Sequence, residues 1–302
     1  MPLPAWDIEG LRPYVQVTDP QPGVMAFIKK FYWMVAVLVD YDDCYRIAYE
    51  NVEDAKQEGI DYIELRFSPW FMAESNRLDP AGVVEAVCDG ITAGQRDFGI
   101  EVNLIGIISR TYGSEKGWEE LQALLTQRNR IKALDLGGDE ANFPGEIFVE
   151  HFRRAREVGW GVTIHAGEMD GPSSIWQAIN GLGAIRIGHA VTATQDAKLM
   201  EYMAEHRIGV ESSLTSNVQT TTVNSYGIHP IREFLENRIL VTLNTDDPGI
   251  SGIDLRYEYE YAAPLAGLNQ TQIRQLQANS LEIAFLSQEE KYALLSRKST
   301  KQ

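Results

Sequence analysis

Short runs of apolar and β-branched residues recur along this chain, and most are followed by a stretch with helical periodicity. The runs begin roughly 20–40 residues apart, the length of a β-strand plus a helix that crosses back over a sheet. This alternation predicts a parallel sheet covered by helices. Seven strands are expected, at Ile60–Phe67, Ile100–Ile108, Ile131–Leu136, Gly161–His165, Ala184–Gly188, Arg207–Ser212 and Ile239–Thr245.

The segments around these strands are expected to be helical or irregular. The first 57 or so residues should form loop followed by helix, and the C-terminal tail a helix that begins with a capping box at Ser287 and Glu290. No linker, low-complexity tract or exact repeat divides the chain, so we expect residues 1–302 to form one domain. Five helices between the strands are expected at Pro80–Phe98, Glu115–Arg128, Phe148–Val158, Ser173–Gly181 and Asp196–His206.

Polar side chains at the strand ends distinguish a closed barrel from an open sheet. An open sheet concentrates its site at one switch point, whereas a barrel gathers residues from the whole rim. No glycine-rich nucleotide-binding pattern is present. We therefore expect an α/β fold of the (β/α)8 TIM-type barrel class, with the first of its eight strands missing from this sequence. Nearly every predicted strand ends in a polar group, namely Glu64, Arg66, Ser109, Arg110, Asp135, His165, Glu168, His189, Glu211, Ser212, Asp246 or Asp247.

Composition limits the partners of the protein. With 27 basic and 43 acidic residues, the net charge of -16 disfavours nucleic acid and anionic membranes and suits a neutral small molecule. The two cysteines, Cys44 and Cys88, are expected to be reduced and buried. The N-terminus lacks the features of a signal peptide, so we expect a soluble cytoplasmic protein. The sequence does not set the oligomeric state, and a monomer is compatible with it.

Two consecutive strands end in histidine. His165-Ala-Gly-Glu168 follows an apolar strand, and Ile185-Arg-Ile-Gly-His189 ends the next one. A core histidine and a glutamate at a helix start would explain the first motif equally well when it is taken alone. Together, however, the two strands place both imidazoles on one rim, where they could bind a metal ion or take part in catalysis.

The last predicted strand ends in two adjacent carboxylates, Asp246 and Asp247, followed by Pro-Gly. A solvated Asp-Pro-Gly turn is the alternative to a metal ligand beside a substrate-binding acid. Ser216 and Asn217 lie in a polar turn that is a weak signal by itself. We assign no role to the other histidines: His151 and His206 lie on predicted helices, and His229 precedes Pro230 in a loop.

Taken together, these motifs resemble the adenosine deaminase family, closest to its bacterial members. They are Ser-Leu-Thr-Ser-Asn217, His165-Ala-Gly-Glu, Arg-Ile-Gly-His189, Asn-Thr-Asp-Asp247-Pro-Gly, Glu64-Leu-Arg-Phe-Ser-Pro and Asp135-Leu-Gly-Gly-Asp-Glu. The resemblance covers essentially the whole chain. It implies an eight-stranded barrel that binds one Zn²⁺ per chain and hydrolyses adenosine, and with it deoxyadenosine, to inosine-type products and ammonia. The cysteine-ligated zinc deaminases are excluded because neither cysteine fits their signature.

The resemblance also implies roles for individual residues. His165 and Asp246 correspond to zinc ligands, and Glu168 to the acid that protonates purine N1. His189 corresponds to the residue that orients and stabilises the attacking hydroxide. The implied substrate-binding groups are the Gly138 amide, which donates to purine N3, and Asp247, the partner of N7. The resemblance places Ser216 behind Asp246 as its support.

Two departures from the family pattern matter. The family's first strand carries His-x-His-Leu-Asp-Gly with two zinc ligands, and nothing in Met1–Val24 matches it. We therefore expect the polypeptide as given to have little zinc-dependent deamination, and the missing strand to be encoded upstream. The alternatives are a non-catalytic nucleoside-binding relative and a deaminase of another purine such as adenine. The second departure is Ala190, where glycine usually follows the histidine; its methyl would crowd the site slightly or be harmless.

Overall fold

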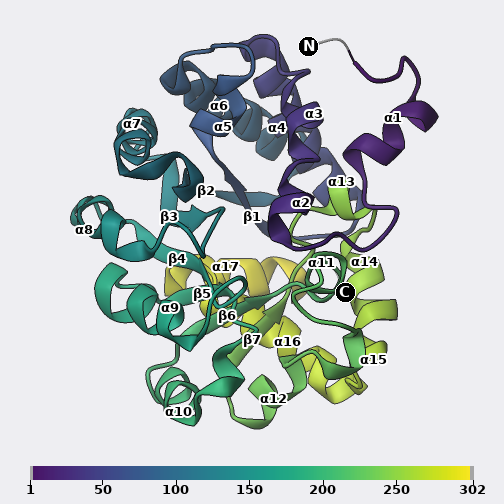
Figure 1. The fold of residues 1–302 in the computed structure, drawn as a ribbon, viewed down its shortest axis with the longest axis vertical. Helices are drawn as coiled ribbons and strands as arrows, with labels where there is room; N and C mark the ends of the chain where they lie inside the picture. Colours follow the sequence, from purple (N-terminus) through teal and green to yellow (C-terminus); the bar gives the residue numbers. More distant parts are fainter. Residues whose placement is uncertain (1–2, 300–302) are drawn as a thin grey trace.

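A computed structural model of the protein describes residues 3–299. The strands form one parallel sheet in which each pairs with the next along the chain (Figure 1). All seven predicted strands are confirmed, with ends that differ by a few residues. They are β1 (Tyr62–Phe67), β2 (Glu101–Ser109), β3 (Ile131–Gly137), β4 (Gly161–Ala166), β5 (Arg186–His189), β6 (Gly209–Ser212) and β7 (Leu240–Leu243).

Ion pairs inside the sheet show that it is strongly curled. Arg66 on β1 lies 2.7 Å from the Asp135 carboxylate on β3 and 2.6 Å from that of Glu211 on β6. Arg186 on β5 pairs with Glu64 on β1 at 2.6 Å. Strand β1 is far from β5 and β6 in the sheet order, so single side chains can join it to them only across the interior of a barrel-like shell. The curled sheet confirms the TIM-type prediction and excludes a doubly wound sheet.

Helices cover the outside of this shell. Helix α6 has the predicted bounds because Asp79 caps its first turn, Pro80 begins it, and Gly99 ends it at a φ of +66° that suits glycine. The predicted helix at Ser173–Gly181 is instead α9 followed by the π-helical turn η3. The covering helices and turns are α5 (Pro69–Glu74), α6 (Pro80–Phe98), η1 (Arg110–Tyr112), α7 (Gly113–Leu125), η2 (Gly145–Phe148), α8 (Val149–Glu157), α9 (Pro172–Gln177), η3 (Ala178–Leu182), η4 (Ala193–Gln195), α10 (Ala197–Glu205), α11 (Leu214–Gln219), η5 (Tyr226–Ile228) and α12 (Ile231–Glu236).

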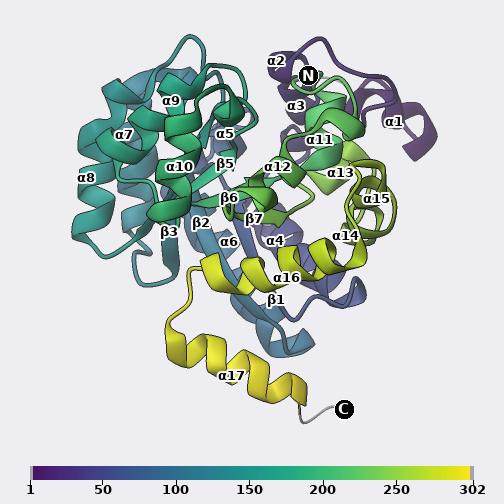
Figure 2. The same cartoon turned by 90° about the horizontal axis from the view of Figure 1, so that it is seen from below.

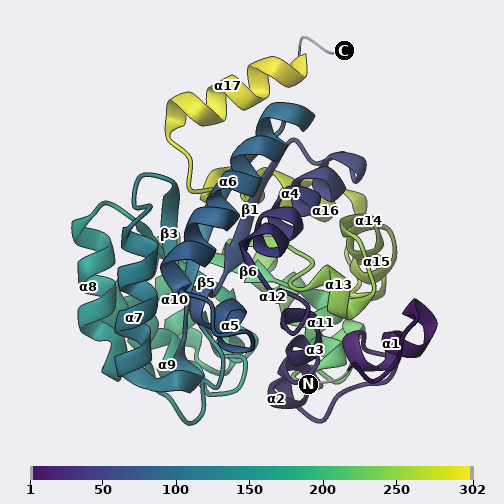
Figure 3. The same ribbon diagram turned by 90° about the horizontal axis from the view of Figure 1, so that it is seen from above.

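The segment before β1 is more helical than the sequence predicts, and it has no strand within the described residues. It contains α1 (Ile8–Val15), α2 (Val24–Ile28), α3 (Phe31–Val35) and α4 (Tyr41–Gln57). Long-range contacts fix this segment: the Val17 amide donates to the Ile250 carbonyl, and the Gln21 amide donates to the Gln219 carbonyl. The first three helices therefore lie beside α11 and α13 (Figures 1 and 3).

The C-terminal part continues from α13 round the barrel. Helix α17 runs outside the shell below α16 (Figure 2), and the predicted capping box is confirmed by reciprocal hydrogen bonds between Ser287 and Glu290. Cys44 and Cys88 are free and buried, as predicted. No helix within residues 3–299 is long and apolar enough to cross a membrane. This part consists of α13 (Pro248–Ser251), α14 (Leu255–Tyr257), η6 (Glu258–Ala262), α15 (Ala263–Leu265), α16 (Gln270–Ile283) and α17 (Gln288–Ser299).

Candidate active site at the carboxyl ends of the strands

His165 on β4 is held from behind by a buried carboxylate. Its Nδ1 lies 3.0 Å from Asp135 Oδ2 on β3. Burial by itself would lower the pKa of His165, but the ionised Asp135 outweighs it and raises the pKa to about 9. Because Nδ1 is engaged, Nε2 is the nitrogen left to face the site. A carboxylate behind a histidine is the usual arrangement for a metal ligand.

Three predicted site residues come together at the rim. Potential ligand atoms of His165, His189 and Asp246 all lie within 4.8 Å of one another. The imidazole rings of the two histidines are 5.1 Å apart between centroids. Ser216 Oγ donates to Asp246 Oδ2 at 2.7 Å, the contact expected for a residue that supports Asp246. Side chains from β4, β5, α11 and the end of β7 thus converge on one point.

The backbone is strained at this point. His189, Ala190 and Asp246 have φ values of +63°, +53° and +58°, in the left-handed region that non-glycine residues rarely adopt. Such strain persists only where surrounding structure holds it, and it is concentrated at functional sites. The φ of Ala190 also explains why glycine suits this position. Ala190 is fully buried, so its methyl is accommodated despite the strain.

Glu168 and Asp247 are acids whose pKa values are raised. Burial, reinforced by the charges of Asp246 and Glu140, raises the pKa of Glu168. Burial and the neighbouring Asp246 raise the pKa of Asp247 well above its ordinary value. Glu168 Oε2 lies 3.5 Å from His189 Nε2. The raised pKa values favour the protonated acids, which can donate hydrogen bonds or a proton.

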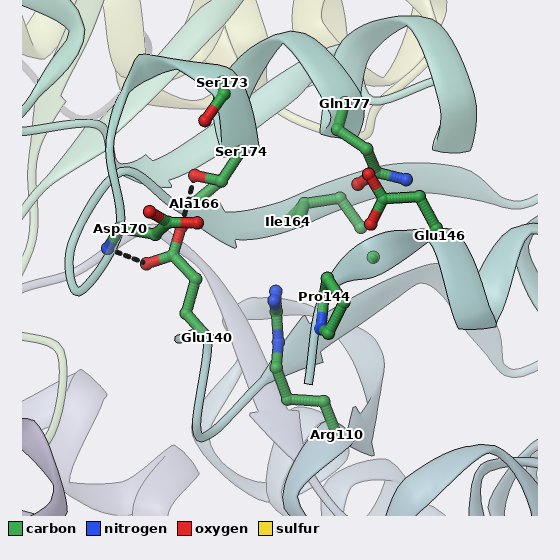
Figure 4. Close-up of a pocket in the computed structure, with 11 residues that line it drawn as sticks. Arg110, Glu140, Pro144, Glu146, Ile164, Ala166, Asp170, Ser173, Ser174 and Gln177 are labelled. Carbon is green, nitrogen blue, oxygen red and sulfur yellow. Dashed lines mark hydrogen bonds between the residues drawn. The ribbon is translucent and has the colours of Figure 1, made fainter. Parts of the chain in front are cut away.

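A further acid, Glu140, holds the loop that carries Glu168. One oxygen of the Glu140 carboxylate accepts from the amides of Glu168, Met169 and Asp170, at 2.7–3.2 Å, and the other from the Gly167 amide at 2.6 Å. Figure 4 shows Glu140 directed at Asp170 and Ser174. Sequence reasoning missed this function, although Glu140 closes the Asp-Leu-Gly-Gly-Asp-Glu motif, where a buried acid next to glycines is a usable signal.

Gly138 lies just beyond β3 on the same rim. Its φ of +105° and the position of Thr111 Oγ1, 2.5 Å from where a Cβ would stand, both require glycine. No contact described within residues 3–299 joins Gly138 directly to His165, His189 or Asp246. The structure therefore places the Gly138 amide at the edge of the site and not within the cluster.

A cavity of about 80 Å³ lies behind β4, on the helix side of the sheet. Arg110, Ile164, Ala166 and Gln177 line it (Figure 4). Successive side chains of a strand point to opposite faces, so Ile164 and Ala166 point away from the face that carries His165. This cavity is separate from the histidine–aspartate cluster.

Two further polar residues back His189. Asn217 Nδ2 lies 3.1 Å from His189 Nδ1, and Asn217 Oδ1 lies 3.1 Å from His229 Nε2. His229, to which the sequence assigns no role, therefore lies beside the site, because a loop folds it there. The other two histidines lie elsewhere: His151 stacks on Trp118, and His206 stacks on Tyr202.

A curled parallel barrel with histidines and a carboxylate at the carboxyl ends of its strands defines a metal-dependent hydrolase class. The profile of the adenosine deaminase family matches residues 1–301. The chain belongs to the adenosine deaminase family. Adenosine deaminase of Vibrio cholerae is 58% identical over 295 residues, which cover 98% of this chain and 88% of the relative. The family acts as a hydrolase on C–N bonds of cyclic amidines.

Solved structures agree with this placement. An adenine deaminase from Arthrobacter aurescens has a TM-score of 0.90 at 26% identity and covers all of this chain and 91% of that one. The Arabidopsis protein ADAL, solved in complex with GMP, has a TM-score of 0.84 at 26% identity, covering 97% of this chain and 87% of that one. The barrel is thus shared with an adenine deaminase and with a protein solved in complex with GMP.

Proposed function

We propose that this site hydrolyses adenosine at C6, giving inosine and ammonia. The substrate is that of the relatives 58% identical over nearly the whole chain. The structural observation that carries the proposal is the position of Glu168. This buried acid, with a raised pKa, lies 3.5 Å from His189 and next to a cluster of potential metal ligands.

The two donors that this chain supplies are of the kinds that zinc takes. Imidazole nitrogen and carboxylate oxygen are ligands that zinc takes in catalytic sites, and a carboxylate such as Asp135 behind the imidazole strengthens them. We assign His165, through Nε2, and Asp246 as residues that would hold it. When bound, zinc lowers the pKa of water so that hydroxide is available near neutral pH.

The acids of this chain suit the purine ring. Attack at C6 builds negative charge on N1, so a protonated Glu168 that donates there lowers the barrier. Purine N7 is a hydrogen-bond acceptor, and the raised pKa of Asp247 favours the protonated carboxyl, which can donate to N7. The Gly138 amide would donate to N3. Three donors around the ring would fix the orientation of the base.

His189 and Glu140 would act on the water and the loop. His189, in contact range of both Glu168 and Asp246, would orient the attacking water. Glu140 holds the backbone around Glu168, so the Glu168 carboxyl would stay directed at N1 while its proton is transferred. Thus His189 would position the water, and Glu140 would position Glu168.

A substrate panel tests the proposal. The protein expressed from its complete gene should release ammonia from adenosine and deoxyadenosine faster than from adenine or AMP, measured side by side with zinc present. Ser213-Leu-Thr-Ser-Asn217 resembles the nucleoside-acting branch of the family, which supports this order. A preference for adenine or AMP, or binding of nucleosides without any turnover, would overturn the proposal.

A further inference from the structure

A buried row of hydrogen bonds leads from a backbone amide to the ring of His189. The Ile231 amide lies 3.1 Å from His229 Nδ1, His229 Nε2 lies 3.1 Å from Asn217 Oδ1, and Asn217 Nδ2 lies 3.1 Å from His189 Nδ1. The side chains of His229, Asn217 and His189 are all buried. Bulk solvent therefore has little access to these side chains.

Each hydrogen bond in the row has a fixed direction. A backbone N–H can only donate, so His229 Nδ1 accepts and the proton of its neutral ring lies on Nε2. Burial lowers the pKa of His229 to about 3, which keeps this ring neutral. His229 Nε2–H then donates to Asn217 Oδ1, and the amide group of Asn217 turns its NH₂ toward His189. Nδ1 of His189 must accept.

The opposite orientation of the Asn217 amide is inconsistent with the number of donors on the His229 ring. With its NH₂ toward His229, both nitrogens of that ring would accept hydrogen bonds, which a neutral imidazole cannot do because one nitrogen carries a proton. The neighbours of Asn217 Nδ2 agree with the first orientation, since Thr222 Oγ1 at 3.2 Å and Glu168 Oε1 at 3.4 Å can both accept.

We infer that His229 and Asn217 are positioning residues that set the tautomer of His189, with its proton on Nε2 and directed into the site. Nε2 is the atom 3.5 Å from Glu168 Oε2 and 4.0 Å from Asp246 Oδ2. In this tautomer His189 is a hydrogen-bond donor to an attacking oxygen. In the other it presents a lone pair toward that oxygen. The effect of this tautomer on the rate of deamination rests on the proposed function, whereas the tautomer itself does not.

The tautomer can be measured directly. Long-range ¹H–¹⁵N NMR of the full-length protein labelled with ¹⁵N-histidine separates protonated from bare ring nitrogens. His189 and His229 should both show a protonated Nε2 and a bare Nδ1. A proton on His189 Nδ1 in the unaltered protein would overturn the inference, whatever the activity of the protein and whether or not any variant folds.

Variants test the direction of the row. Asn217→Asp presents an accepting oxygen to His229 and another to His189, so the proton of the His189 ring should move to Nδ1. His229→Gln retains a donor toward Asn217 and should keep the tautomer, whereas His229→Leu should not. If adenosine is the substrate, His229→Leu should lower kcat at least about tenfold with KM nearly unchanged, and His229→Gln should recover most of it.

A surface histidine supplies the matched control. His206→Gln, remote from the row, should leave the His189 signals and the kinetics unchanged. If Asn217→Asp and His229→Leu fold and also leave the His189 signals unchanged, the row does not set the tautomer. If the signals move but adenosine is not deaminated by any form, the inference stands and the proposed function fails.

Discussion

Asp135 Oδ2 lies 3.0 Å from His165 Nδ1, at the point where the ion pairs inside the barrel meet the rim of the site. The same carboxylate pairs with Arg66, which also holds Glu211. The residue assigned as a metal ligand is thus anchored through one buried acid to charges on β1 and β6. This connection links the stability of the barrel to the geometry of its site.

Replacing that acid should weaken metal binding. Asp135→Asn removes the charge behind His165 and should lower zinc affinity about 10–100-fold, the usual effect of losing a carboxylate behind a ligand. Zinc titration with a competing chelator measures the change. Asp139→Asn is the matched control, since the Asp139 carboxylate accepts hydrogen bonds from Asn142 instead of a histidine, and it should leave zinc affinity unchanged. Equal affinities for Asp135→Asn and the unaltered protein would contradict the role of Asp135.

Loss of the Glu140 carboxylate should free the loop that carries Glu168. Glu140→Gln replaces one accepting oxygen by an NH₂ group facing backbone donors, so the amides of Gly167–Asp170 should exchange with deuterium at least about tenfold faster, as expected when charged hydrogen bonds are lost. Hydrogen-exchange mass spectrometry reports this segment. Glu146→Gln, on the same cavity, should leave the exchange as it is. Unchanged protection in Glu140→Gln would show that other contacts hold the loop.

Breaking the interior ion pairs should destabilise the barrel. Arg66→Met leaves Asp135 and Glu211 buried without one of their partners, so the free energy of unfolding should fall by about 3–5 kcal/mol in urea titrations. The exposed Arg153, paired with Glu150 at 2.7 Å, is the control, and Arg153→Ala should have almost no effect. Similar losses of unfolding free energy in both variants would mean that burial of the ion pair does not determine how much it stabilises the fold.

Stability should fall in acid through Glu211. Burial alone would raise the pKa of Glu211, but Arg186 and Arg66 outweigh it and lower the pKa to about 2, from an ordinary value of 4.5. A carboxyl whose pKa is lowered by folding stabilises the fold above the unfolded-state pKa, and this stability is lost as the pH falls toward the folded-state pKa. The difference in unfolding free energy between the unaltered protein and Glu211→Gln should therefore shrink from about pH 6 to about pH 3. A constant difference would contradict this assignment.

The sequence predicts the sheet well because buried parallel strands are continuous apolar runs, and their carboxyl ends share one edge. For this reason the strand pattern alone places His165, His189 and Asp246 together. The helices α1 to α3 do not follow from periodicity, since contacts such as that of Val17 with Ile250 fix them.

The supporting positions of Asn217, His229 and Glu140 do not follow from the sequence for a similar reason. Asn217 and His229 are twelve positions apart and meet only because the loop after α11 turns back. Glu140 reaches a loop that begins 27 residues later. Periodicity reports which face of an element is buried, but it carries no information on the path of such loops.

In the proposed reaction, Glu168 supplies the proton for deamination of adenosine at this site. The direct measurement is the rate of conversion of adenosine to inosine by Glu168→Gln, beside its affinity for inosine, in the protein from the complete gene. We expect kcat to fall about 10²–10⁴-fold with inosine affinity changed only slightly, because the amide retains the shape of the acid but cannot transfer a proton to N1. A variant that deaminates adenosine as fast as the unaltered protein would contradict it.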